Sequence, residues 1–273
     1  MEAAIMIVIV MVAIGLIFGL VLAIANKKLS VESNPLIAEV EEILPKGQCG
    51  ACGFAGCAAY AEAVVLNPDV APNLCVPGKQ EVAEKVSAIT GKVAEKVEPR
   101  IAHICCSGSP DKAKAAFNYT GVKDCAAASM LSGGPKECKY GCLGFGNCIN
   151  ACKFGALSLG ENGLPVVDVK KCTGCAACEK ACPKKVIHML PLKAHVQVDC
   201  NSCDKGAIAR KKCAAACIGC GLCAKNCAYE AIHIVNNLAV VDPGICAEKC
   251  TETTCTAKCP TKAIKIKAVA SEK

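Results

Sequence analysis

The sequence predicts an α+β protein with a single N-terminal transmembrane helix, a small helical domain and two tandem units built from short strands and cysteine-rich loops. The chain opens with a long apolar run, and 26 of its 273 residues are cysteines in spaced groups. Short strand-like segments flank the later groups in the same order twice. Tryptophan is absent and aromatic residues make up 3% of the chain, so few large side chains can organise these domains. Bound metal groups can organise them instead, because ligand bonds contribute folding free energy directly.

The first element is an uninterrupted apolar run over residues 3–25, and about 20 such residues span a bilayer as a helix. Lys27-Lys28 follows it, and lysines beside a membrane helix stay on the cytoplasmic side. We expect residues 1–28 to be a single-pass anchor in the cell (inner) membrane, with the bulk of the chain in the cytoplasm. A signal peptide fits less well, because the run is long and lacks a basic leader. Gly15 and Gly19 form a GxxxG pair suited to helix packing, although glycine is also simply common in membrane helices.

The first cysteine group lies between two predicted helices, PLIAEVEEIL and AAYAEAVV, in residues 29–78. The glycines between its cysteines let the backbone wrap closely around a bound object. A zinc site is the alternative, but zinc sites usually pair two short CxxC knuckles and this group has one. We therefore expect a small helical [4Fe–4S] domain. Its expected ligands are Cys49, Cys52, Cys57 and Cys75.

The second and third cysteine groups predict a bacterial-type 2[4Fe–4S] ferredoxin unit over residues 136–199. The third group has the CxxCxxCxxxCP spacing, in which the fourth cysteine binds the cluster of the other group. The segments ALSLGENGLPVVDV and VIHML predict short strands. One cluster is expected on Cys138, Cys142, Cys148 and Cys182. The other is expected on Cys152, Cys172, Cys175 and Cys178.

The fourth cysteine group repeats this layout about 80 residues later, which indicates an internal duplication. The second ferredoxin unit is expected over residues 200–273, with a hairpin turn at Asn236-Asn237 in AIHIVNNLAVVD and a last strand in AIKIKAV. One cluster is expected on Cys217, Cys220, Cys223 and Cys259. The other is expected on Cys227, Cys246, Cys250 and Cys255, which brings the expected total to five clusters.

The remaining cysteines flank the first ferredoxin unit on both sides, and its two ends can meet in a compact fold. We expect a sixth cluster there, and buried free thiols are the alternative. Its expected ligands are Cys106, Cys125, Cys200 and Cys213, with Cys105 and Cys203 as spare or alternate ligands. These cysteines fall partly in a connecting segment, residues 101–135. Residues 79–100 precede it and read as an amphipathic helical linker.

Composition and motifs exclude several functions. The formal net charge of +7 counts every cysteine as neutral. Each [4Fe–4S] core with four thiolates carries about −2, so five clusters would bring the chain to roughly −3, and we expect no nucleic-acid partner. No GxGxxG motif after a strand, no P-loop and no nucleophile constellation occurs. We therefore expect no catalytic residues on this chain alone and no ligands among its four histidines.

Several stretches together resemble the B subunit of the Rnf complex in its long, multi-cluster form. They are the N-terminal anchor, CGACGFAGCAAYAEA, LCVPGK, the run from Cys106 through Cys152, and CIGCGLCAKNCAYEAI. The likeness spans nearly the whole chain. The first of these cysteine motifs also resembles a domain of corrinoid iron–sulfur proteins, so the anchor and the run from Cys106 to Cys152 are more specific.

The resemblance implies a subunit of an ion-translocating ferredoxin:NAD⁺ oxidoreductase, a translocase that exports Na⁺ or H⁺. In that family the B subunit takes electrons from soluble ferredoxin and passes them to subunits A and E in the membrane. Subunits C, D and G carry the flavin or nicotinamide chemistry. The resemblance further implies that ferredoxin docks on the C-terminal unit and that electrons leave from the cluster nearest the anchor.

Two other functions remain open from the sequence. The related complex that keeps a redox-sensing transcription factor reduced would use the same clusters with a different electron acceptor. An iron–sulfur scaffold that donates clusters to other proteins is the third candidate, although it would need neither a membrane helix nor two complete ferredoxin-type pairs.

Overall fold

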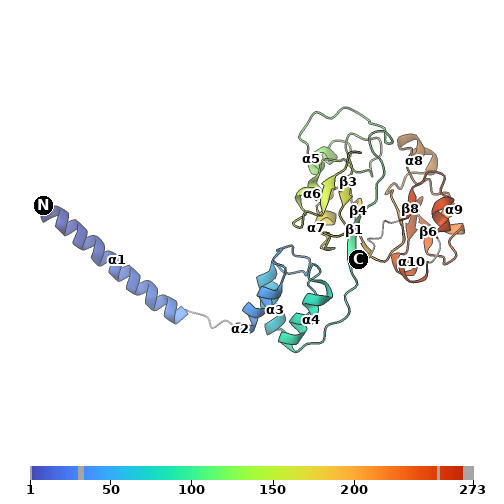
Figure 1. Ribbon diagram of the computed structural model, residues 1–273. Coiled ribbons are helices and arrows are strands. Elements are labelled where there is room, and N and C mark those ends of the chain that lie inside the picture. Colours follow the sequence, from blue (N-terminus) through green and yellow to red (C-terminus); the bar gives the residue numbers. More distant parts are fainter. Residues whose placement is uncertain (1, 30–33, 251–252, 267–273) are drawn as a thin grey trace.

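The computed structural model describes residues 2–29, 34–250 and 253–266. Figure 1 shows a long single helix, a small helical domain and two units of paired strands along the chain. Helix α1 (Glu2–Leu29) stands apart from the rest, and its apolar side chains are exposed, with Leu16 and Leu20 at 70% and 65%. It is the one helix in the described ranges that is long and apolar enough to cross a bilayer. The predicted helix over the apolar run is therefore confirmed. Among the described residues, no atom other than those of the chain neighbours and the adjoining helix backbone lies within 4 Å of the place where a Cβ would stand at Gly15 or Gly19.

The helical domain consists of α2 (Pro35–Ile43), α3 (Cys57–Leu66) and α4 (Lys79–Thr90). Helix α2 begins at Pro35, which presets the helical φ, and the side chain of the preceding Asn34 accepts a hydrogen bond from the Leu36 amide. The core between the three helices contains the fully buried side chains of Val40, Tyr60, Val64 and Val86. Helices α2 and α3 confirm the two helices predicted in PLIAEVEEIL and AAYAEAVV.

The predicted linker over residues 79–100 is helical only in its first half. Helix α4 ends at Gly91, which has a φ of +67°, because glycine adopts the left-handed conformation at a helix end without steric cost. The extended chain beyond it stays attached to the helical domain. The Val97 amide donates to Gln80 Oε1 at 2.9 Å, and the Asn73 side chain donates to the Glu95 carbonyl at 3.4 Å.

The first unit contains two antiparallel strand pairs. The outer pair is β1 (Arg100–Ile104) with β4 (Ile187–Pro191), and the inner pair is β2 (Leu157–Leu159) with β3 (Pro165–Val167). The second unit repeats this topology. Its outer pair is β5 (Val196–Val198) with β8 (Ile264–Ile266), and its inner pair is β6 (Ile232–Val235) with β7 (Leu238–Val241).

The hairpin predicted at Asn236-Asn237 is present, with both asparagines at positive φ as a two-residue turn requires. The strand predicted in AIKIKAV is present as β8, and its residues after Ile266 lie outside the described ranges.

The structure places the unit boundaries differently from the expected residues 136–199 and 200–273. Strand β1 starts at Arg100, in the expected linker, and pairs with β4 of the first unit. Strand β5, expected in the first unit, pairs with β8 of the second. Outer strands pair with partners far along the chain, so spacing between neighbouring cysteines does not reveal them.

Seven short helices lie in the cysteine-rich loops, and each contains a cysteine or ends next to one. They are α5 (Cys125–Met130), α6 (Asn147–Asn150), α7 (Ala177–Lys180), α8 (Gly206–Lys212), α9 (Leu222–Lys225), α10 (Pro243–Lys249) and α11 (Thr254–Ala257). The core of each unit consists of short aliphatic side chains packed against buried cysteines. The cysteines are thus part of the packing and not an addition to it.

Candidate iron–sulfur sites

The cysteines gather into six sets of four, which we number by their contacts with one another. Site 1 contains Cys49, Cys52, Cys57 and Cys75 of the helical domain. Site 2 contains Cys152, Cys172, Cys175 and Cys178. Site 3 contains Cys125, Cys142, Cys148 and Cys182. Site 4 contains Cys106, Cys138, Cys200 and Cys213. Site 5 contains Cys217, Cys220, Cys223 and Cys259. Site 6 contains Cys227, Cys246, Cys250 and Cys255.

The donor chemistry of these sites fits iron–sulfur clusters. Each of sites 3 to 6 is a separate cavity with four cysteines in its lining. Zinc would hold its thiolates at about 2.3 Å, which requires the sulfurs to converge tightly. No three cysteine, histidine or acidic side chains of the described residues converge closely enough for a single metal ion. A cube of four irons and four sulfides is larger, and four thiolates around a cavity suit it.

Site 1 forms where the loop after α2 meets the start of α3. The side chain of Gln48 accepts a hydrogen bond from the Cys57 amide at 2.9 Å, which fixes the loop across the helix end. Gly50 and Gly53 have positive φ, so the backbone can curl around the cavity. Burial raises the pKa of Cys75 to about 11, and the thiols of Cys57, Cys52 and Cys49 add to the effect. The structure thus brings together all four cysteines predicted for this domain.

Sites 5 and 6 contain the same four cysteines that the sequence predicted for each, and Cys259 joins the group of Cys217 in the crossed arrangement. In site 2, Cys178 interacts with Cys172 and Cys175. Cys152 packs in the same core, and we place it in site 2 on the sequence spacing. Short helices and glycines with positive φ, such as Gly174 and Gly219, set the loop geometry. Local spacing determines these loops, so the structure groups their cysteines as the spacing predicts.

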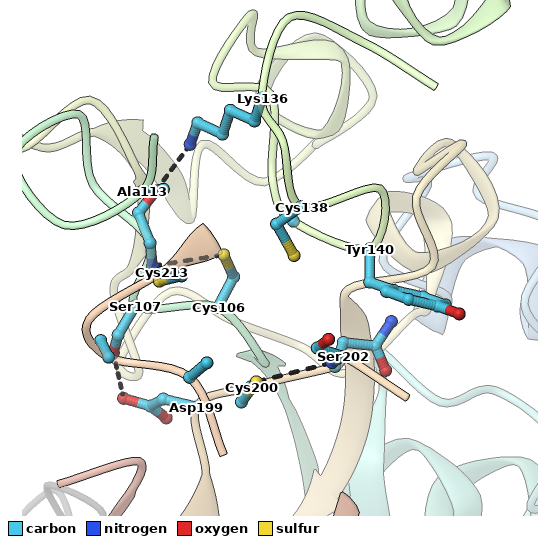
Figure 2. A pocket seen from close by; sticks show the side chains of 15 residues that line it. Cys106, Ser107, Ala113, Lys136, Cys138, Tyr140, Asp199, Cys200, Ser202 and Cys213 are labelled. Atoms are coloured by element: carbon cyan, nitrogen blue, oxygen red, sulfur yellow. Dashed lines mark hydrogen bonds between the residues drawn. The ribbon is translucent and has the colours of Figure 1, made fainter. Parts of the chain in front are cut away.

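Sites 3 and 4 differ from the expected grouping by one exchange. Cys125, expected with Cys106, Cys200 and Cys213, lines the cavity of Cys142, Cys148 and Cys182. Cys138 takes its place: Figure 2 shows the sulfurs of Cys106, Cys138, Cys200 and Cys213 around one cavity. The sequence prediction thus placed Cys125 in site 4 and Cys138 in site 3, whereas the structure has Cys125 in site 3 and Cys138 in site 4.

Two local clusters of hydrogen bonds explain the exchange. Asp124, the N-cap of α5, accepts from the Asn147 side chain at 2.7 Å, and Asn147 accepts from the Cys125 amide at 2.9 Å. This pair holds α5 against α6, beside Cys148. Lys136 donates to the carbonyls of Gly108 and Cys142 at 2.6 and 2.7 Å, which keeps the following Cys138 beside Cys106. Neither contact is visible in the cysteine spacing.

Backbone amides point at several of the sulfurs. Cys106 Sγ accepts from the amides of Gly108 at 3.4 Å and Cys142 at 3.3 Å, and Cys200 Sγ accepts from Ser202 at 3.5 Å. Hydrogen bonds to cluster sulfurs are one of the means by which a protein sets reduction potential. Burial raises the pKa of Cys142 and of Cys200 to about 12, so these thiols stay neutral unless a metal replaces the proton.

Neighbouring sites interact through their ligands, by hydrogen bonds between sites 3, 4 and 5 and by electrostatic interaction between thiols at the other boundaries. The Cys142 amide of site 3 donates to Cys106 of site 4, and the backbone of Cys217 of site 5 is hydrogen-bonded to the Cys200 thiol of site 4. Burial raises the pKa of Cys178 to about 12, with a contribution from Cys148 across the boundary between sites 2 and 3. Burial also raises the pKa of Cys255 to about 11, and Cys223 of site 5 contributes.

Site 1 meets site 2 where the helical domain touches the first unit. A Cβ at Gly47 would lie 2.8 Å from Cζ of Phe154, so the ring packs directly on the glycine backbone. Gly47 precedes Cys49 by two residues, and Phe154 follows Cys152 by two. Burial raises the pKa of Cys49, and Cys175 of site 2 adds to that effect. These hydrogen bonds and electrostatic interactions connect the sites in the order 1–2–3–4–5–6.

Cys105 and Cys203 line none of the four cavities of sites 3 to 6. Cys105 is largely buried, burial raises the pKa of its thiol to about 12, and its amide donates to the Val186 carbonyl at 2.7 Å. Cys203 is exposed, and its carbonyl accepts from the Asn237 side chain at 3.2 Å. Two histidines have carboxylate partners: His103 faces Asp199, and His188 faces Glu179.

Comparison with protein families agrees with two of these regions. Residues 44–77, which contain site 1, match the family described as "Putative Fe-S cluster". Residues 165–188, which contain the CxxCxxCxxxCP run, match the family described as "4Fe-4S binding domain". The first match supports an Fe–S cluster in the helical domain, and the second supports a [4Fe–4S] cluster in the first unit.

Three curated proteins are similar to this chain along most of its length. It is 60% identical to the B subunit of the proton-translocating ferredoxin:NAD(+) oxidoreductase complex of Clostridium ljungdahlii, over 97% of this chain and 93% of that protein. It is 42% identical to the B subunit of the Na(+)-translocating ferredoxin:NAD(+) oxidoreductase complex of Acetobacterium woodii, over 92% and 74%. It is 41% identical to the B subunit of the ion-translocating oxidoreductase complex of Methanosarcina acetivorans, over 94% and 96%.

Proposed function

This chain belongs to the family of B subunits of the ion-translocating ferredoxin:NAD⁺ oxidoreductase, or Rnf, complexes, and from that premise we propose that it holds six [4Fe–4S] sites and conducts electrons from reduced ferredoxin along this series to partner subunits in the membrane. The family makes it an electron-transfer subunit of an ion-translocating oxidoreductase. The number of clusters, their ligands and the direction of transfer are the parts that we propose.

The observation that carries the proposal is the series of ligand hydrogen bonds between sites 3, 4 and 5, which electrostatic interactions between thiols continue to sites 1, 2 and 6. When bound, a [4Fe–4S] cluster takes up and releases one electron at a time. The residues of this chain hold the thiols, exclude water and supply amide hydrogen bonds at the sulfurs. We propose ligands for each site as grouped above, with Cys125 in site 3 and Cys138 in site 4. The two strand units are then tandem ferredoxin-type units joined by site 4.

We propose that ferredoxin docks on the second unit, at site 5. Cys220 is the exposed ligand among the cysteines of the six sites in the described residues, so the cluster edge there is nearest to solvent. Leu222 and Ile234, beside it, are 42% and 37% exposed, and such apolar surface suits a protein partner. Lys205 and Lys225 are exposed on the adjoining segments and favour an acidic carrier.

We propose that electrons leave from site 1, next to the anchor. Helix α1 brings the helical domain to the membrane, where we expect subunits A and E to accept electrons, with subunits C, D and G elsewhere in the complex. The Lys27-Lys28 pair supports a cytoplasmic location for the domains that follow the anchor. No ionisable residue lies between Ala3 and Ala25, so ion translocation belongs to those partners.

The test compares the two exposed cysteines of the second unit. In membranes containing the whole complex, Cys220→Ala should lower ferredoxin-dependent NAD⁺ reduction at least about ten-fold, a change of roughly 1.4 kcal/mol in barrier. Cys203→Ala is the matched control and should retain the wild-type rate, because its side chain lines neither cavity of the second unit. Equal rates in the two variants would contradict entry at site 5. A wild-type chain that reduced ferredoxin leaves unreduced in EPR would contradict the function itself.

A further inference from the structure

A group of charged and polar side chains around the buried Asp199 joins the two units beside site 4. Asp199, 9% exposed, lies at its centre. Lys265 Nζ is 2.6 Å from Asp199 Oδ2, and His103 Nε2 is 3.0 Å from Oδ1. Ser107 completes the group: its hydroxyl donates to Asp199 Oδ2 at 3.2 Å and accepts from Lys265 at 2.6 Å.

These side chains come from segments that are distant in the sequence. His103 lies in β1 of the first unit, and Lys265 lies in β8, the last described strand of the second. Backbone hydrogen bonds run alongside: the Ser107 amide donates to the Asp199 carbonyl at 2.9 Å, and the Asp199 amide donates to the Ala263 carbonyl at 2.7 Å. Asp199 is therefore held from both units at once.

The group is adjacent to two ligands of site 4. Asp199 precedes Cys200 and Ser107 follows Cys106, and Figure 2 shows both at the edge of the cavity with those cysteines. Cys106 and Cys200 are also the residues through which site 4 contacts sites 3 and 5. Contacts that hold the sulfurs of Cys106 and Cys200 in place therefore also hold the junction between the two units.

We propose that Asp199 and Lys265 are positioning residues that hold Cys106 and Cys200 in place and set the reduction potential at site 4. The inference rests on the proposed function, because it takes site 4 as a cluster in the electron path. The charges of Asp199 and Lys265 oppose each other; the Asp199 carboxylate is buried while the Lys265 side chain is 45% exposed, so solvent screens the pair only in part. Removing one of them therefore leaves an unbalanced charge beside the cluster.

Removing the charge of Asp199 and removing the charge of Lys265 should shift the reduction potential of site 4 in opposite directions. Reduction adds an electron to the cluster, so a nearby positive charge favours the reduced state and a negative charge disfavours it. Asp199→Asn leaves Lys265 unbalanced and should raise the potential of one reduction step. Lys265→Met leaves Asp199 unbalanced and should lower the same step. Lys265→Arg keeps the charge and should restore the wild-type potential.

The measurement is an anaerobic redox titration of the full chain followed by EPR, with iron and sulfide counted in each sample. All variants should retain about 24 irons. Lys85→Met is the matched control, because it breaks the exposed Lys85–Glu81 pair on α4, away from the two strand units, and should leave every step unchanged.

Opposite shifts in the two variants support the proposal. Loss of iron, equal shifts in one direction, or no shift would overturn it, since a purely structural role would not reverse with the sign of the charge. A wild-type chain with about 20 irons, unaffected by Cys138→Ala, would instead refute site 4 and with it that part of the proposed function.

Discussion

Asn147 and Asp124 show how single residues decide the membership of a site. Their side-chain pair holds α5 against α6, so Cys125 lines the same cavity as Cys148 although it lies in the segment before the expected first unit. Lys136 does the same for Cys138 by donating to two carbonyls. Sequence spacing predicts the grouping of most of the cysteines, because runs of four are local. It could not assign these two, because their partners lie in another loop and the contacts that place them are polar side chains.

This grouping predicts the outcome of two substitutions. Cys138→Ala should remove the cluster between the units, and Cys125→Ala should remove its neighbour in the first unit, each with a loss of about four irons. The two variants should lose different EPR signals, and only Cys138→Ala should lose the signal that the Asp199 and Lys265 variants shift. Cys105→Ala is the control and should keep its iron, since Cys105 lines neither cavity. Loss of the same signal in both variants would contradict the exchange.

At the scale of elements, the end of α3 depends on a residue from outside the helix. Lys92, just after α4, donates to the carbonyls of Val64, Asn67 and Val70 at 2.6, 2.7 and 2.8 Å. The last carbonyls of a helix have no partners within it, and a cation near them also interacts favourably with the helix dipole. Helix α4 ends at Thr90 with Gly91 as its C-cap, and Lys92 comes directly after it, where its ammonium reaches the end of α3.

We expect Lys92→Met to destabilise the helical domain by about 1–3 kcal/mol, the usual cost of losing hydrogen bonds to a charged group. Hydrogen exchange of the full chain should show faster exchange at the amides of α3, with the strand pairs unaffected. Lys85→Met is again a suitable control, because its carboxylate partner is exposed. If the α3 amides of Lys92→Met exchange as slowly as in the wild type, the prediction is wrong, and water replaces the Lys92 ammonium without loss of stability.

The strands illustrate what the sequence could and could not predict at this scale. The inner hairpins were predictable, because alternating apolar residues surround a recognisable turn at Asn236-Asn237. The outer strands β4 and β8 were predicted as strands, but β1 and β5 were not, and the sequence indicated no pairing partner for any of the four. Ile101 pairs with Leu190 and Gln197 with Lys265 across most of a unit, and no local rule connects such positions.

For the whole molecule, the structure depends on what the cysteines bind. Both units have cores of small aliphatic residues and buried cysteines, including Cys148, Cys178, Cys223 and Cys246. Such a core buries little apolar area, so ligand bonds must contribute much of the folding free energy. The low aromatic content of the sequence already indicated this.

Anaerobic removal of iron by a chelator should therefore unfold both units. Far-UV circular dichroism in detergent should retain the signal of α1 and lose the strand signals, and limited proteolysis should cut between residues 100 and 266. Reconstitution with iron and sulfide should restore protection. A metal-free chain that keeps its protease resistance would show that side-chain packing alone suffices.

The placement of the ligands along the chain also has a consequence for biosynthesis. Site 1 has its full set of cysteines once Cys75 has left the ribosome, and the three helices around it are complete by Thr90. Site 4 must wait for Cys213, although Cys106 emerges more than a hundred residues earlier, and β1 must wait for β4. Domains fold in order of synthesis. The membrane-proximal domain can thus be loaded with iron during translation, whereas sites 4, 5 and 6 all wait for cysteines of the second unit, and Cys259 of site 5 is the last of them to emerge.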